Sequence, residues 1–308
     1  MDQMKAIVKR SEKPADLALQ EVRIPAISEN ELLIQVKAIG VGIHDGYFLP
    51  KAIHYPYPIG IEAAGVIEEV GEKVTSYQKG DRVAFVSSMQ VKGGTWAEYA
   101  VVADSSLIIP IPEGMSFKEA AAVPVAGNTV LKALKSLDLQ KDDTVFIAGA
   151  SGAIGTFAIQ LAVAKGCRVA GSASIRNHNY MISLGAEKVV DYHDADWTEQ
   201  IKQWQPDGVD AVMAIQPNTA SVSAEVLKEG GKIVAVSGDQ FRPQKPINIK
   251  PFPYQDDVSN ELLQLMEKIY SGTIQLVIEQ EYPFERALEA LRKTETRRAR
   301  GKLVITMP

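Results

Sequence analysis

The sequence is short of several features that would point directly to a class of function. Its 308 residues contain one cysteine, Cys167, so the chain cannot form an internal disulfide or a four-thiolate zinc site. No apolar run approaches the roughly 18 residues that a membrane-spanning helix requires. The formal net charge of −5 gives no electrostatic argument for a nucleic-acid partner. We therefore expect a cytoplasmic protein that works on neither membranes nor nucleic acid.

What remains is the balance of an ordinary globular protein, with 46% hydrophobic and 23% charged residues. A chain of this length suits two domains. The first 110 or so residues hold short runs rich in Val, Ile and Ala, separated by glycines and prolines, which predicts a small β-barrel or sandwich. These runs cover residues 4–8, 31–38, 64–70, 82–86 and 97–102.

The pattern changes after residue 112. An alanine-rich helix is expected over 117–137, and strands then alternate with helices, which predicts a parallel sheet wound on both faces. Four prolines over 242–253 indicate a connecting loop. Helices are expected at 260–269 and 283–293, and a last strand at 303–306 that returns to the first domain. The remaining expected strands are 144–148, 168–171, 188–190, 209–214 and 232–236, and the helices are 155–165, 179–184, 196–203 and 220–227.

The most informative segment is the turn between the strand 144–148 and the helix that follows. Small residues there let backbone N–H groups approach a pyrophosphate, and the helix N-terminus adds unpaired donors and a partial positive charge. A third glycine lets the helix pack closely on the strand. Since a strand precedes the turn and a helix follows it, the segment predicts a dinucleotide site. Its residues are Gly149, Ala150, Ser151, Gly152, Ala153, Ile154 and Gly155.

The end of the next strand distinguishes the two nicotinamide cofactors. An NAD site usually carries an acidic residue there, which accepts a hydrogen bond from the ribose 2′-hydroxyl. Residues 171–178 contain no acid but include Ser174 and Arg176. A carboxylate would repel a 2′-phosphate, whereas these two side chains could bind it. The segment therefore favours NADPH, although Arg176 could equally be a solvated charge at a helix start.

At this point the sequence resembles the zinc-independent branch of the medium-chain dehydrogenase/reductase superfamily, close to the NADPH:quinone oxidoreductases. The matching segments run in the same order over nearly the whole chain. They are residues 40–45, 60–67, 80–83, 94–99, 126–129, the glycine turn, 184–186 and 300–304.

The resemblance implies a GroES-like β-barrel domain at 1–116 and 266–308, a Rossmann domain at 117–265, an active site in the cleft between them, and a homodimer. It implies that Asp45 and Tyr47 lie near the nicotinamide as the catalytic residues, and that Thr129 lies near the cofactor in the cleft. It places Tyr192 beside the 2′-phosphate, with Ser174 and Arg176, and it places Ser237 and Gly238 near the nicotinamide half. Three departures are Gly42, where many relatives have Asn, Asn177, where many have Lys, and a short stretch at 237–260.

The zinc-dependent branch of the superfamily is a poor match. A catalytic zinc needs three protein ligands and an open position. That branch has Cys where this chain has Gly42, and His where it has Ile61, so two donors are missing. The spacing of His44 and His54 fits no metal motif, and we interpret them as surface residues. Cys167 begins an apolar strand and is better explained as a packing residue than as a nucleophile.

Without a Lewis acid, alcohol oxidation is disfavoured, because an alkoxide would lack stabilisation. A quinone or an α,β-unsaturated carbonyl needs less help, because the charge that develops on oxygen is delocalised. We therefore predict an NADPH-dependent reductase of such small-molecule acceptors, with Tyr47 as a proton donor, a stacking ring or a plain wall of the cleft. Two alternatives are an enoyl-thioester reductase and a non-enzymatic NADPH-binding protein with a structural or RNA-binding role, although the acidic balance argues against RNA.

Overall fold

The computed structural model describes residues 3–87 and 90–308 and divides the chain into two compact units. The first unit contains residues 1–125, 262–270 and 278–308, and the second contains 126–261 and 271–277. The chain therefore leaves the first unit and returns to it. The domain limits expected from the sequence stay a prediction. Among the described residues, no helix is both long and apolar enough to span a membrane.

The first unit is built from two β-sheets. Its three-stranded sheet has the order β2-β1-β4, and its larger sheet runs β15-β16-β3-β5-β6-β8, with β7 paired to β3. The last strand pairs antiparallel with β3, so residues from opposite ends of the sequence share this sheet. The strands are β1 (Gln3–Lys9), β2 (Leu17–Arg23), β3 (Glu31–Val41), β4 (Tyr57–Pro58), β5 (Glu62–Val70), β6 (Arg82–Val86), β7 (Tyr99–Ala103), β8 (Ile108–Pro110), β15 (Ile278–Pro283) and β16 (Lys302–Thr306).

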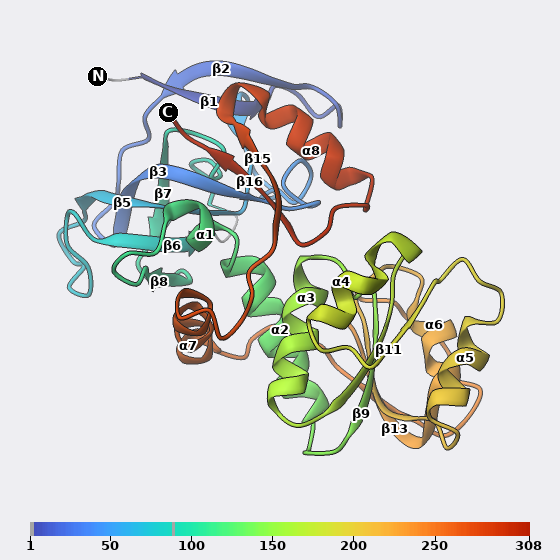
Figure 1. Ribbon diagram of the computed structural model, residues 1–308. Coiled ribbons are helices and arrows are strands. Elements are labelled where there is room, and N and C mark those ends of the chain that lie inside the picture. Colours follow the sequence, from blue (N-terminus) through green and yellow to red (C-terminus); the bar gives the residue numbers. More distant parts are fainter. Residues whose placement is uncertain (1–2, 88–89) are drawn as a thin grey trace. The chain divides into compact units, whose positions relative to one another are not determined.

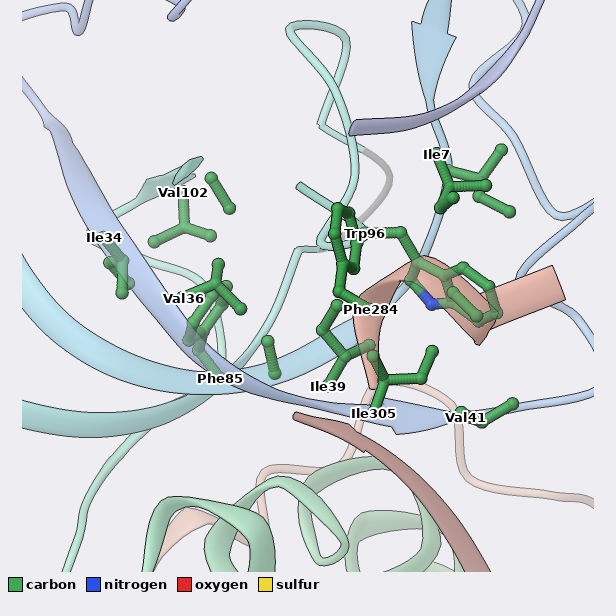
Figure 2. Packing of buried hydrophobic residues seen from close by; sticks show 14 of the residues in the cluster. Ile7, Ile34, Val36, Ile39, Val41, Phe85, Trp96, Val102, Phe284 and Ile305 are labelled. Carbon is green, nitrogen blue, oxygen red and sulfur yellow. The ribbon is translucent and has the colours of Figure 1, made fainter. Parts of the chain in front are cut away.

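A large apolar core holds this unit together. Figure 2 shows Trp96, Phe284 and Ile39 gathered in it, and all three are fully or almost fully buried. Most of β3 is buried, because β3 lies inside the sheet, with β16 and β5 pairing along it, and because its side chains reach the core. Burial of one large apolar side chain stabilises the folded state by about 1.5–3 kcal/mol. Because many such side chains are buried here, the core holds β3 in place, and with it the start of the turn that follows Val41.

The second unit is a doubly wound parallel sheet, as the alternating pattern predicts. Its strand order is β11-β10-β9-β12-β13-β14, and every pairing is parallel. Figure 1 shows α3 on one side of these strands and α5 and α6 on the other. The order reverses between β9 and β12, which is where open α/β sheets bind their ligands.

The elements of the second unit follow one another in the expected sequence. The strands are β9 (Thr144–Ala148), β10 (Arg168–Ser172), β11 (Lys188–Val190), β12 (Val209–Ala214), β13 (Leu227–Ala235) and β14 (Asn248–Lys250). The helices of the whole chain are α1 (Phe117–Ala121), α2 (Pro124–Leu137), α3 (Ala153–Ala164), α4 (His178–Ser183), α5 (Trp197–Trp204), α6 (Ala220–Ser223), α7 (Ser259–Tyr270) and α8 (Ala287–Glu295).

Several details differ from the expectation. The helix expected over 117–137 is two helices, because Pro124 lacks an N–H donor and starts a new helix instead of continuing the first. The helix expected over 220–227 ends as a 3₁₀ turn, and its last residue already belongs to β13. The proline-rich loop contains the short edge strand β14, because Pro246 and Pro251 lie outside its three paired residues. The pattern also missed β2 and β15, which carry few buried side chains, and β4 and β8, which are only two and three residues long.

Candidate functional site

The glycine turn follows a fully buried strand. All five residues of β9 are buried, and the chain then turns at Gly149, whose φ of +83° is a conformation that side-chain-bearing residues rarely adopt. The turn is held by backbone bonds from Gly152 N–H to the Gly149 carbonyl, 3.3 Å, and from Ala150 N–H to the Ser172 carbonyl, 3.1 Å. The turn is therefore anchored to the two neighbouring strands.

The helix after the turn starts in a way that suits an anion. Gly152 is the N-cap of α3, and no side chain caps the helix, whose first residues are Ala153 and Ile154. A Cβ on Gly152 would meet only the Gly149 carbonyl oxygen, at 3.7 Å, so the approach to the helix N-terminus is open. A Cβ on Gly155 would lie 2.5 Å from the backbone of Ala150. These residues fit a pyrophosphate, because the side chains of the turn are small and no side chain caps the first N–H groups of α3.

The loop after β10 brings two of the predicted contact residues, Ser151 and Ser174, together through Asn177. The amide nitrogen Nδ2 of Asn177 donates to Ser151 Oγ, at 3.2 Å, and lies 3.4 Å from Ser174 Oγ. Asn177 is buried, whereas Arg176 is exposed on the same loop. The Asn177 amide therefore joins this loop to the glycine turn.

An acidic residue lies beside this loop that the sequence argument did not include. The carboxylate of Asp191, directly after β11, accepts a hydrogen bond from Ile175 N–H at 3.0 Å. It also accepts from the backbone and ring nitrogens of His193, at 3.0 and 2.7 Å, and these bonds hold its pKa below the usual range despite partial burial. The half-exposed ring of Tyr192 packs on that of His193. The sequence argument looked for an acid only at the end of β10. Looking also at the end of the following strand, β11, could have revealed Asp191.

The ends of β12 and β13 carry a second polar cluster. The side chain of Gln216 packs over Gly149, since a Cβ on Gly149 would lie 2.6 Å from Gln216 Cγ. Ser237 Oγ donates to Asp239 Oδ1 at 2.9 Å, and the Gly238 that separates them has a φ of +78° with open space around it. The position of Gln216, directly after the strand beside β9, could have identified it from the predicted strand order.

Asp239 joins the two loops of this cluster. Its Oδ2 atom accepts from the backbone N–H groups of Thr219, at 3.0 Å, and Ala220, at 3.2 Å. Burial alone would raise the pKa of Asp239, but these bonds and the Ser237 hydroxyl hold it below the usual range. The loop after β12 is therefore pinned to the loop after β13.

The predicted cofactor residues of the second unit thus gather at adjacent strand ends. The carboxyl ends of β9, β10, β11 and β13 carry all of them except Thr129, which lies half-buried in α2. Parallel strands bring their carboxyl ends to one edge of the sheet, so a single extended ligand could reach these loops. Which of them contact a cofactor stays a prediction.

In the first unit, the turn after β3 separates the two predicted catalytic residues. Asp45 is buried, and its Oδ2 atom accepts from Gly42 N–H at 2.7 Å. Its other oxygen has no hydrogen-bond partner among the described residues, and burial raises the pKa of this carboxyl to about 7, against the opposing effects of the Gly42 bond and of Lys302. Asp45 therefore faces the interior and braces the turn.

A buried ion pair lies beneath this turn. Lys302 Nζ donates to Glu62 Oε1, and both side chains are almost completely buried. The other oxygen of Glu62 accepts from the backbone N–H of Val125, in the first turn of α2, at 2.7 Å. A Cβ on Gly40 would collide with the Ala121 carbonyl oxygen and lie 2.8 Å from Glu62 Cδ, so the glycine makes room for both α1 and the pair. No local pattern could reveal this pair, because its members are 240 positions apart.

The outer side of the turn is aromatic. Tyr47 is 57% exposed and Phe48 51% exposed, so the turn presents both rings to its surroundings. The ring of His44 lies edge-on to both, with centroids 5.4 Å from Tyr47 and 6.2 Å from Phe48. Sequence reasoning selected Tyr47 but missed Phe48, and its interpretation of His44 as a surface residue agrees with the exposure of His44. Among the described residues, no group of three or more His, Cys, Asp or Glu side chains could hold a metal ion.

Comparison with known proteins identifies the family. Residues 28–113 match the alcohol dehydrogenase GroES-like domain, and residues 184–305 match the zinc-binding dehydrogenase family. A quinone oxidoreductase of Sus scrofa is 31% identical over 96% of this chain and 94% of its own length. A 2-methylene-furan-3-one reductase of Solanum lycopersicum is 30% identical over 92% of this chain and 74% of its own.

The solved structures agree. A quinone oxidoreductase from Coxiella burnetii superposes with a TM-score of 0.88 at 29% identity, covering 99% of this chain and all of that one. The expected fold class, a Rossmann sheet with a GroES-like domain, is confirmed. The family implies a nicotinamide cofactor and a small-molecule substrate. The chain is an oxidoreductase of the medium-chain dehydrogenase/reductase superfamily, among its quinone oxidoreductase-like members.

Proposed function

We propose that this protein is an NADPH-dependent, zinc-independent reductase of quinones or α,β-unsaturated carbonyls. The observation that carries the proposal is the open, uncapped N-terminus of α3 behind the glycine turn, joined through Asn177 to the loop of Ser174 and Arg176. The turn offers backbone donors to a pyrophosphate, and the loop offers a hydroxyl and a guanidinium to a 2′-phosphate.

The Asp191 carboxylate sets a condition on the choice of NADPH. One of its oxygens accepts hydrogen bonds from His193, and the other accepts from Ile175 N–H, so both oxygens are committed locally. In this proposal Arg176 supplies the positive charge that outweighs the carboxylate. NADPH is therefore expected to bind at least tenfold more tightly than NADH, in line with the charge-assisted bonds that the 2′-phosphate gains.

The proposed class of acceptor follows from the absence of two zinc ligands. The two positions where zinc-dependent relatives carry Cys and His are Gly42 and Ile61, neither of which can bind a metal. The cofactor, when bound, supplies a hydride. The protein orients the acceptor and excludes water, and an acceptor that spreads the developing charge over a conjugated system requires no metal. Asp45 braces the turn, while Tyr47 offers a ring or a proton to the acceptor.

The relatives support this class of acceptor. Some of them are named quinone oxidoreductases, and others an enone reductase or a trans-enoyl reductase. An assay of NADPH oxidation with 1,4-benzoquinone, a short enone and crotonyl-CoA separates the three. We expect turnover with the first two. Turnover with crotonyl-CoA alone would identify an enoyl-thioester reductase, and no turnover with any of them would refute the proposal.

The remaining parts of the proposal concern the oligomeric state, the location in the cell and the non-enzymatic alternative. We propose a homodimer in the cytoplasm, on the family expectation, and light scattering of the purified protein tests the dimer. A binding protein without catalysis is the alternative. It would retain NADPH, reduce none of the three acceptors and bind a U-rich RNA in a salt-sensitive way at micromolar protein.

A further inference from the structure

The turn after β3 carries the imidazole of His44, a polar group to which the proposed function assigns no role. His44 lies on the same turn as Asp45 and Tyr47, but only His44, Tyr47 and Phe48 point outward from it. Among residues 3–87 and 90–308, no hydrogen bond or ion pair involves the His44 imidazole. A ring nitrogen of His44 is thus available at the rim of an exposed aromatic surface.

The turn is rigid, so the direction of the His44 ring is defined. The His44 carbonyl accepts from Tyr47 N–H at 3.1 Å and from Phe48 N–H at 2.8 Å. Asp45 N–H donates to the Gly42 carbonyl at 3.2 Å, while the Asp45 carboxylate closes the turn from inside. Both faces of the turn are therefore fixed by hydrogen bonds, and the edge-on contacts with Tyr47 and Phe48 hold the imidazole.

The surroundings favour the neutral form of this imidazole. Burial lowers the pKa of His44, and the positive charges of Arg297 and Lys302 lower it further. A neutral imidazole carries one N–H donor, and such a group can polarise a carbonyl without giving up its proton. Apolar rings with a single polar group are the usual lining of a site for a small planar ligand.

We propose that His44 donates a hydrogen bond to the carbonyl oxygen of the acceptor, which is a planar conjugated carbonyl lying against Tyr47 and Phe48. This inference rests on the proposed reductase function. When the acceptor takes up a hydride, two electrons enter its conjugated system and its oxygen becomes negatively charged. The His44 N–H stabilises that oxyanion, and water then supplies the proton that completes the reduction.

Three variants separate donation from packing. His44→Phe keeps an aromatic ring but removes the donor, and we expect kcat/KM for the acceptor to fall about 10- to 100-fold. His44→Gln keeps an N–H donor and is expected to retain most of that activity. The matched control is His54→Phe, the same substitution at an exposed position ten residues later in the same connection between β3 and β4, which should leave kcat/KM unchanged. Equal losses in the Phe and Gln variants of His44 would overturn the proposal.

A binding measurement tests the same contact without turnover. The probe is 4-nitrophenol, whose phenolate is planar, coloured and anionic at oxygen, as the reduced acceptor is. With the protein saturated in NADP⁺, we expect His44→Phe to weaken phenolate binding about tenfold and to abolish the spectral shift seen with wild type, whereas His44→Gln preserves both. Unchanged phenolate affinity and spectrum in His44→Phe would refute the role of His44. If the wild type binds phenolate in this way but reduces no acceptor, the reductase proposal fails while the His44 contact stands.

Discussion

The buried carboxyl of Asp45 makes the stability of the first unit depend on pH. Burial raises the pKa of Asp45 from 3.8 to about 7, because Lys302 is already paired with Glu62 and compensates Asp45 only in part. The folded protein therefore keeps a proton on Asp45 that the unfolded chain releases above pH 3.8. The resulting stabilisation is fully present below pH 3.8 and is lost as the pH rises towards 7 and beyond.

The size of the effect follows from that interval. Each pH unit between 3.8 and about 7 changes the free energy of unfolding by about 1.4 kcal/mol, so the full change is about 4 kcal/mol. Asn has the same shape as protonated Asp and does not titrate. Between pH 5 and pH 7, the wild type should therefore lose about 2 kcal/mol relative to Asp45→Asn.

Urea unfolding followed by tryptophan fluorescence measures this difference, since Trp96 lies in the same core as the turn. Both proteins are unfolded at pH 5, 6, 7 and 8, and only the difference between them is used, so that other titrating groups cancel. Glu72→Gln removes an exposed carboxylate from the same unit and should show no such trend. A difference between wild type and Asp45→Asn that stays constant from pH 5 to pH 8 would refute the reasoning, because Lys302 would then outweigh burial.

Three further predictions concern the cofactor turn and the buried pair. Arg176→Ala should weaken NADPH binding about 10- to 100-fold and leave NADH binding unchanged, as calorimetric titration with both would test; equal losses for the two would contradict its assignment. Lys302→Met should lower the free energy of unfolding by about 3–5 kcal/mol because it leaves Glu62 buried and unpaired, and the double variant with Glu62→Gln should recover part of it; urea unfolding measures both. Gly155→Ala should cost about 1–3 kcal/mol and weaken either cofactor, because its Cβ would press on the backbone of Ala150; intact cofactor binding would count against the close packing of α3.

The sequence predicted the second unit better than the first. Alternating strands and helices specify a doubly wound sheet almost completely, because each element is long enough to show its period and each crossover is local. The first unit depends on pairings that no local pattern carries, such as that of β16 with β3. The strand β2 was missed because half of its residues are exposed, so it lacks the apolar run that marked its neighbours.

Some residues of the candidate site could likewise be predicted from local sequence, and others could not. The glycine turn and the loop of Ser174 and Arg176 were found because their chemistry lies within one short segment. Asp191 and Gln216 were missed, since each reaches the site only through the packing of a neighbouring strand. Asp45 and His44 are consecutive in sequence, and only the folded turn decides that the carboxyl faces the core and the imidazole faces outward.

The pairing of β16 with β3 has a consequence for the order of folding during synthesis. The strand β3 emerges early from the ribosome, but one of its partners, Leu303–Thr306, is made only after the whole of the second unit. All six strands of the Rossmann sheet, by contrast, are contiguous within residues 144–250 and can pair as soon as they emerge. The nascent chain should therefore acquire its nucleotide-binding half first and leave residues 38–41 of β3 unpaired on one edge until the last strand arrives, since β7 covers only residues 31–35 of that edge. During that interval the exposed edge of β3 is the part of the protein most in need of a chaperone.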